Sequence, residues 1–295
     1  MLKLATLTGL FLCSSLGLTG QVEKFYTIKE ASNFDTVEFH LKATATNCLI
    51  KKSKADLHPL TIYGNPNLEK INPSFGSKID RLTCYASLKL DEYNSTGFGD
   101  SFSMAVTGSD EENDFWEVDL NNKIYKLNLI YGFGNANIDL TGTAVHRLKI
   151  KSGSADINVG YDRNSPNPIK MDTFFVKADF GSITARHMEL THAKNVITKV
   201  GFGNVLLDFE KGTVDQCRVS ASVGAGNLEI VLPKYSTPVI IRIKGSPLCA
   251  VKLVDGYEEV ESNVFVNMAY VADATDLLSF DVDVALGMVR FRHAD

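Results

Sequence analysis

Acidic side chains are the first residues in this sequence whose type and spacing could do chemistry. Four of them lie at outward positions of successive strand-like segments: Asp139, Asp156, Asp208 and Glu229. Two carboxylates on one outward face are what hydrolysis of a glycosidic bond requires, one as general acid and the other as base or nucleophile. A row of acids is equally the usual composition of a face in contact with water, and we favour that interpretation.

Two of the six histidines, His187 and His192, are close enough in the chain to suggest a metal pair. A spacing of five residues places them on no common strand face, because side chains of a strand alternate with a period of two. We therefore expect neither to be a metal ligand.

An acidic segment, SDEENDFWEVD at residues 109–119, contains alternating acids as calcium-binding loops do: Asp110, Glu112 and Asp114. It lacks the central glycine and the distal bidentate glutamate that such a loop needs. We expect a solvated hairpin tip here, which would also carry Trp116, the only tryptophan of the chain. Calcium binding by residues 110–119 stays open.

Motifs of enzymes are absent from the sequence. There is no G-x-S-x-G, no phosphate-binding loop, no H-E-x-x-H and no C-x-x-C. The G-x-G pairs at Gly132 and Gly201 are followed by no helical pattern, so they do not indicate a dinucleotide site. The sequence predicts a protein without catalytic, cofactor-binding or metal-binding residues.

The N-terminus is typical of an export signal. Lys3 is followed by an apolar run over residues 4–18 and by small residues up to Gly20. The run is shorter than the ~20 residues that a membrane-spanning helix needs. We expect cleavage after residue 20 and a mature chain from Gln21 with no integral membrane segment, exported to the periplasm, the outer membrane surface or the extracellular space.

Four cysteines follow the leader: Cys48, Cys84, Cys217 and Cys249. In an exported protein they could form two disulfides, with three possible connectivities. Buried free thiols are the alternative, because three of the four share strand parity with apolar neighbours. The sequence leaves both possibilities open.

The charge of the chain restricts its partners. The formal net charge is −5 at pH 7 and the pI is about 5.7. Neither basic runs nor aromatic residues interleaved with basic ones occur, which argues against nucleic acid and against an anionic membrane surface as partner. An envelope protein or a glycan is the partner we expect.

One short pattern recurs along the chain and must position all these residues. Each copy is a strand-like alternation, a corner with glycine and a second alternation. The corner glycines Gly134, Gly153, Gly181, Gly203 and Gly226 are 19, 28, 22 and 23 residues apart. Strands at such a period, without helical spacing, predict an all-β fold, a single-stranded β-solenoid or β-helix with short coils of about 20–25 residues.

A phenylalanine precedes the corner glycine in four copies: Phe98, Phe133, Phe180 and Phe202. These residues share strand parity with Ile150 and Val200, which we expect to point inward. Coils stacked ~4.8 Å apart would place the rings over one another as an internal ladder. Exposed rings that stack on sugars are the alternative, and we favour the internal ladder.

The pattern divides the chain into a signal peptide at residues 1–20, degenerate coils with loop insertions at 21–125 and regular coils at 126–295. We expect nine or ten coils, one of them near Cys249 and Val251. A short helix or strand near residues 26–34 is expected to cover the N-terminal end. At the C-terminal end we expect an uncovered edge strand, on which only the charges of Arg290 and Arg292 oppose pairing with another chain.

At its Gly-x-Gly-Asn corners the sequence resembles the adhesin-like toast-rack repeat family of bacterial envelope proteins. Relatives of that family are the head GIN adhesin domain and the C-terminal domain of LiaF-type cell-wall stress regulators. The resemblance is carried by GFGNANIDL, SGSADINVG, GFGNVLLDF, VGAGNLEIVLPKYSTPVIIRIKG and YVADATDLLSFDVDVALGMVRF. It covers residues 127–291 well and 34–104 loosely. It implies a β-solenoid and an exported or membrane-facing, adhesin-like or envelope-stress role.

Three hypotheses for function follow. The first is a non-enzymatic exported β-solenoid with a structural, adhesion-like or binding role at the bacterial cell envelope. The second is a periplasmic stress sensor of the LiaF type, although this chain has a predicted cleavable leader where that type has membrane helices. The third is a carbohydrate-active enzyme built on a β-helix, which needs a groove beside the acids.

Overall fold

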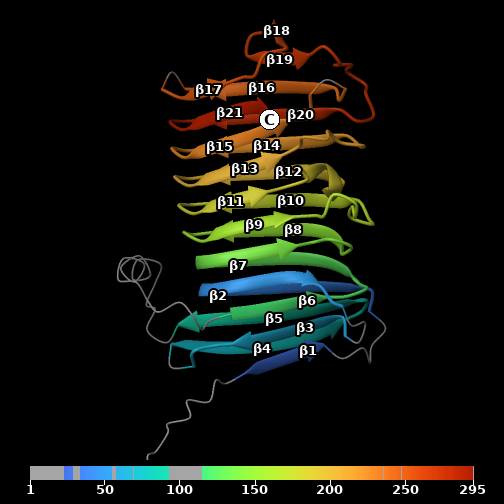
Figure 1. The fold of residues 1–295 in the computed structure, drawn as a ribbon, viewed down its shortest axis with the longest axis vertical. Helices are drawn as coiled ribbons and strands as arrows, with labels where there is room; N and C mark the ends of the chain where they lie inside the picture. Colours follow the sequence, from blue (N-terminus) through green and yellow to red (C-terminus); the bar gives the residue numbers. More distant parts are fainter. Residues whose placement is uncertain are drawn as a thin grey trace, which may run out of the picture.

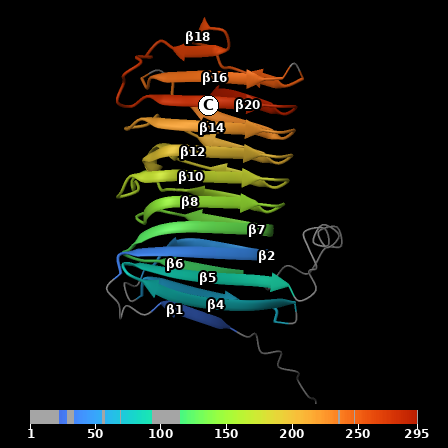
Figure 2. The same ribbon diagram turned by 180° about the vertical axis from the view of Figure 1, so that it is seen from behind.

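The computed structural model describes residues 23–28, 34–54, 58–68, 70–92, 115–234, 236–246 and 248–294, and these form a β-solenoid (Figure 1). Each coil contributes one strand to each of two opposite faces, which Figures 1 and 2 show from the two sides. The described elements are β-strands, except for one 3-10 turn, η2 (Met188–Thr191). The predicted fold class is confirmed.

The central coils follow the order of the chain. They are β7 (Ile124–Asp139), β8 (Ala144–Ser152) with β9 (Asp156–Gly160), β10 (Met171–Ala178) with β11 (Ser182–Ala185), β12 (Ala193–Val200) with β13 (Asn204–Asp208), and β14 (Cys217–Val223) with β15 (Asn227–Leu232). First strands pair in parallel with first strands, and second strands with second strands. Equivalent side chains of successive coils therefore form columns along the stack.

The last coil of the sequence lies inside the stack. Its strands are β20 (Leu278–Val284), between β14 and β16 (Val239–Gly245), and β21 (Met288–His293), between β15 and β17 (Ala250–Lys252). After β15 the chain thus skips one level, builds the β16 and β17 coil and returns to fill the gap. The additional coil expected near Cys249 is confirmed as β17 and its partner β16.

An antiparallel pair closes this end of the stack. β19 (Val264–Asn267) pairs with β16, and β18 (Tyr257–Glu261) pairs with β19. The expectation that the C-terminal strand is an edge guarded only by Arg290 and Arg292 is wrong, because β21 has a parallel neighbour on each side. Exposed glutamates on β18 place charge on the outer strand, which discourages edge-to-edge pairing.

The N-terminal end uses the same arrangement. β2 (Thr36–Lys52) is one continuous coil that lies between β7 and the coil of β5 (Thr83–Glu92) with β6 (Phe115–Leu120). Antiparallel strands complete this end: β4 (Ile71–Asp80) on β5, β3 (Leu60–Asn65) on β6, and β1 (Lys24–Ile28) on β3. The described part of the chain thus forms nine stacked coils, and a strand, β1, lies at the N-terminal end as expected.

The segment predicted as a hairpin tip is partly a core strand. Residues 109–114 lie outside the described residues, but residues 115–119 belong to β6. Trp116 is fully buried and its ring lies 6.5 Å from that of Tyr26. The prediction of a solvated tip is wrong for this part, because alternate residues of β6 face the core.

The core is a continuous apolar column between the two faces. Its aromatic residues differ from those predicted. The buried rings of Phe209 and Phe280 meet edge to face at 5.8 Å, and those of Phe280 and Phe291 at 5.6 Å. Edge-to-face pairs of this kind add to the free energy that burial of the rings already provides.

Candidate functional site

The four predicted acids do not meet at one place. Asp139 and Asp208 share a column but lie three coils apart, which is about 14 Å at the usual strand spacing. Asp156 lies in another column, whereas Glu229 is a diagonal neighbour of Asp208 on the adjacent coil, about 7 to 8 Å away between Cα atoms. Carboxyl pairs that cleave glycosides are separated by roughly 5 to 10 Å. Asp208 and Glu229 alone among the four fall in this range, but the first accepts from the Glu210 amide and the second pairs with Arg292, so neither carboxylate is left free as a general acid or its partner.

Each of these acids instead holds a neighbouring group. Asp139 accepts a hydrogen bond from the Thr141 amide at 3.0 Å, and Asp208 from the Glu210 amide at 2.9 Å. Asp156 accepts one from the Ser182 amide of the next coil at 3.2 Å. Glu229 pairs with Arg292 Nε at 2.6 Å. These bonds fix turns and join coils.

A shallow hollow of about 560 Å³ lies beside one of the acids, Asp139. Polar residues line it: Asn137, Asn158, Thr184, Arg186 and His187. Asp156 and Asp208 do not contribute to it. The hollow is a wide, open depression on the face of the second strands, and it brings no second carboxylate of the predicted set to Asp139.

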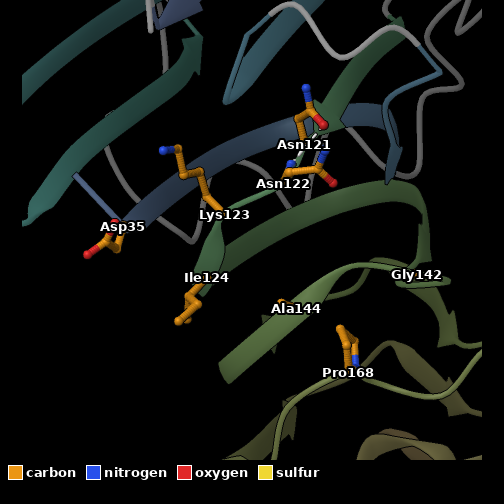
Figure 3. Close-up of a pocket in the computed structure, with 8 residues that line it drawn as sticks. All are labelled: Asp35, Asn121, Asn122, Lys123, Ile124, Gly142, Ala144 and Pro168. Carbon is orange, nitrogen blue, oxygen red and sulfur yellow. Dashed lines mark hydrogen bonds between the residues drawn. The ribbon is translucent and has the colours of Figure 1, made fainter. Parts of the chain in front are cut away.

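A second hollow, of about 350 Å³, lies where β2, β7 and β8 begin (Figure 3). Its polar groups already bond within the protein. Lys123 donates to the Phe34 carbonyl at 2.8 Å, and Asn121 Oδ1 accepts from the Asn122 amide at 2.7 Å. The Asn121 amide donates to the Tyr125 hydroxyl at 2.6 Å. These residues close a turn.

The two histidines flank the turn η2 and face different carboxylates. His187 Nδ1 lies 3.4 Å from Glu189 Oε1, and His192 Nδ1 lies 3.7 Å from Asp215 Oδ2. Burial raises the pKa of the Glu189 carboxyl, and the neighbouring His187 offsets part of this effect. Within the described ranges, no group of three or more His, Cys, Asp or Glu side chains could hold a metal ion.

The cysteines are free thiols in the structure. Three of them, Cys48, Cys84 and Cys217, are buried, and Cys249 is half-buried. Burial raises the pKa of Cys48 and of Cys217 to about 12. Such thiols stay protonated and unreactive at neutral pH, because the thiolate is the nucleophile.

The glycine corner, the short turn between the two strands of a coil, is built by close backbone approach (left side of Figure 1). Four of its glycines are stacked in register: Gly181, Gly203, Gly226 and Gly287. A Cβ at Gly203 would lie 2.2 Å from the Gly181 carbonyl oxygen, and one at Gly226 2.3 Å from that of Gly203. Gly153 is not in this column; Ala155 takes its place opposite Gly181. The predicted corner spacing is wrong by two residues there.

The residues that precede these four glycines, together with Leu248 in the turn between β16 and β17, form an exposed apolar column, which we call the corner ridge. In spatial order its members are Phe180, Phe202, Ala225, Leu286 and Leu248. The two phenylalanines are 60% and 67% exposed, and the two leucines 61% and 76%. The ridge spans five coils, about 19 Å at the usual strand spacing.

The predicted phenylalanine ladder exists in part, but it faces water. The rings of Phe180 and Phe202 stack at 5.4 Å with planes 6° apart, on the outside of the corner. Phe133 is half-buried, and Phe98 lies outside the described residues. The inward prediction is wrong because the turn breaks the alternation: Val200 and Val205 both face inward although they are an odd number of residues apart.

A column of lysines runs beside the ridge, and two of them, Lys177 and Lys199, each lie three residues before a ridge phenylalanine. Lys151, Lys177 and Lys199 are in register on adjacent parallel strands. The same column continues through Ser222 and Asp283 on the next two coils and ends at Lys244. Lys177 pairs with Asp179 at 2.7 Å. Lys151 and Lys199 make no ion pair with any described residue. Like charges stacked directly across strands cost stability.

Sequence reasoning missed both columns. The lysines are 26 and 22 residues apart in the chain, so no basic run is visible. The ridge contains Leu248, whose coil follows that of Leu286 in space although it precedes it in the sequence. The signal that could have found the ridge was the apolar residue between the two corner glycines, interpreted as a turn residue and not as a strand residue.

Comparison with known proteins gives the family. The family described as the N-terminal domain of toast_rack, DUF2154, matches residues 20–173, more than half of the chain. The chain therefore belongs to this toast-rack family, as the resemblance of its corners indicated. No curated protein matches it.

Three solved structures are similar to this chain at low identity. A candidate cell adhesion protein from Clostridium sporogenes ATCC 15579 is 14% identical, with 92% of this chain and 99% of that chain covered and a TM-score of 0.43. A candidate adhesin from Bacteroides fragilis NCTC 9343 is 11% identical, with 92% and 96% covered and a TM-score of 0.38. A candidate adhesin from Parabacteroides merdae ATCC 43184 is 13% identical, with 92% and 97% covered and a TM-score of 0.37.

Proposed function

We propose that this chain is a non-enzymatic, exported β-solenoid with an adhesion-like binding role at the bacterial cell envelope. The observation that carries the proposal is the corner ridge, a line of exposed apolar side chains that the fold does not require. Exposed apolar surface of this kind marks an interaction site in soluble proteins. The stacked coils hold its residues in fixed register, as a solenoid binding surface needs.

The predicted leader supports the envelope location. Its apolar run and small residues are those of an export signal. In the part of the chain that the structure describes, no helix is long and apolar enough to cross a membrane. The scattered acids of the coil faces support a binding role over a catalytic one, since each bonds a structural partner.

Export is tested by expressing the full chain, leader included, in a Gram-negative host. We expect the protein in the periplasmic or outer-membrane fraction, with N-terminal sequencing starting at Gln21. A full-length protein that stays in the cytoplasm would overturn the envelope part of the proposal.

The binding role is tested with the purified mature chain. We expect it to sediment with isolated envelopes, and we expect Phe180→Ala/Phe202→Ala to weaken this binding while Phe25→Ala does not. Phe25 is a suitable control because its exposure, 61%, matches that of the ridge phenylalanines. Release of products from envelope polysaccharides by the wild-type chain would show an enzyme and contradict the proposal.

A further inference from the structure

The corner ridge is too apolar for recognition of a sugar. Of its five residues none carries a polar side-chain atom, and three are aliphatic: Ala225, Leu286 and Leu248. Sites that bind small polar molecules place a few hydrogen-bonding groups among their apolar residues, because these groups fix the orientation of the ligand. At the far end, Met288 is also exposed and extends the apolar surface.

The position of the ridge favours a soft, extended partner. It runs along the narrow edge of the stack, where each coil turns back (Figure 1), and its large side chains are exposed. The offset rings of Phe180 and Phe202, with centroids 5.4 Å apart, leave part of their faces uncovered. A lipid interface accepts such projecting apolar side chains without a shaped pocket.

Charge identifies which lipid surface fits. The lysine column has four lysines beside the ridge, Lys151, Lys177, Lys199 and Lys244. The acids beside them are Asp179, which pairs with Lys177, and Asp283, which lies between Ser222 and Lys244. The strip is therefore net positive although the whole chain carries a formal charge of −5, so the expectation that an anionic membrane surface is no partner does not hold for this strip. Long lysine stems can reach around the corner and hold their ammonium groups at the level of lipid headgroups.

We propose that the corner ridge and the lysine column together form a docking surface for an anionic phospholipid bilayer. The apolar side chains of the ridge enter the boundary between headgroups and acyl chains, while the lysines contact the phosphates. This attachment is peripheral. It deepens the proposed function, on which it rests for placing the chain beside an envelope membrane.

The test uses the purified mature chain with sedimented vesicles of phosphatidylglycerol and phosphatidylcholine, and with phosphatidylcholine alone. We expect binding to the anionic vesicles, weakened by salt, and little to the neutral ones. Lys151→Gln/Lys177→Gln/Lys199→Gln should lower the partition coefficient about fivefold per lysine removed. The control Lys170→Gln/Lys194→Gln/Lys211→Gln removes the same charge from exposed lysines away from the ridge. It should change the partition coefficient by no more than about twofold.

The ridge has its own pair of variants. Phe180→Ala/Phe202→Ala should lower binding at least about tenfold, whereas Phe25→Ala/Met268→Ala, also exposed, should not. An unchanged melting temperature shows that the variants fold. In Phe202→Trp we expect the tryptophan fluorescence to shift to the blue when anionic vesicles are added, and to be quenched by brominated lipid. The buried Trp116 contributes a background emission that the vesicles do not change.

Three results would overturn the lipid inference. They are the absence of binding to anionic vesicles, an equal loss in the ridge and control variants, and ridge-dependent binding to an acidic polysaccharide in place of vesicles. Failure of the proposed function is seen separately, because retention of the full chain in the cytoplasm is measured by fractionation without vesicles.

Discussion

The two corners of each coil reverse the chain with different chemistry. At the glycine corner the backbones of successive coils lie so close that a Cβ would reach the carbonyl oxygen of the coil before, as at Gly203 and Gly226. At the opposite corner polar side chains are buried and bond the backbone. Asn167 accepts from the Val145 amide at 3.1 Å and donates to the carbonyls of Val145 and Thr191.

The same device recurs at the end of the stack. Asn267 accepts from the Val239 amide at 3.0 Å and donates to the Thr237 carbonyl at 2.8 Å. The comparison shows where the surface is free to vary. Polar side chains are part of the core at the opposite corner, whereas at the glycine corner the side chains of the ridge project into solvent. A binding surface can therefore change at the glycine corner without loss of the fold.

Substitution of a stacked glycine should have the largest effect. Gly226→Val places carbon atoms against the Gly203 carbonyl and Val200 Cγ1, which a Cβ alone would approach within 2.3 and 2.8 Å. We expect a loss of about 3 kcal/mol or more in the free energy of unfolding. Gly76→Ala is the control, because nothing lies within 4 Å of its Cβ position, and it should change stability by less than about 0.5 kcal/mol. Equal losses in urea titrations would refute the close-approach explanation.

Removal of the buried amide should come next. Asn167→Ala leaves the Val145 amide and two carbonyls without their partner inside the opposite corner. We expect a loss of about 2 to 3 kcal/mol by thermal or urea unfolding. Asn204→Ala, which removes the exposed bond from Asn227 to Asn204 at the glycine corner, should cost less than about 1 kcal/mol. A reversed order would mean that the two corners do not differ as described.

The exposed ring stack should contribute little. Phe202→Ala removes the contact with Phe180 but uncovers no core, so we expect a loss of at most about 1 kcal/mol. An inward phenylalanine would cost about 3 to 5 kcal/mol on the same change. The midpoint of urea unfolding separates these values, and a loss in the higher range would restore the internal ladder.

The smallest effect concerns the buried carboxyl of Glu189 at the opposite corner. Its pKa is raised by burial, so the folded state binds more protons than the unfolded state between the ordinary and the raised pKa. Stability therefore falls as pH rises through that range. Glu189→Gln should stabilise the protein at pH 7 by less than about 1 kcal/mol, and the difference should vanish as the pH falls below the ordinary glutamate range. Melting temperatures across pH check this, and a destabilised variant at pH 7 would contradict it.

Much of the fold could be predicted because its determinants are local. Alternation marked the strands around Ile150 and Val200, and glycines marked the corners. The division at residue 125 into degenerate and regular coils stays a prediction, and β2 pairs directly with β7 across it. The position of the last coil could not be predicted, because strands of all coils share one alternating pattern and nothing in β20 or β21 specifies its neighbours.

The candidate site was harder to predict than the fold. The acids Asp139 and Asp208 were correctly placed on outward positions, but their distance depends on how many coils separate them in the stack. The exposure of Phe202 differed from the sequence prediction, since parity counted along the chain does not continue through a turn. The burial of Trp116 differed because its acidic segment continues into the core strand β6.

The sequence by itself determined that the chain winds into strands of period two with glycine at one bend, because these preferences act over a few neighbouring residues. Only the tertiary structure decided which coils touch, and hence that lysines 22 to 26 residues apart stand side by side next to two stacked phenylalanines. The physical reason is that a column along the stack is defined by hydrogen bonds between coils, which join residues distant in the chain.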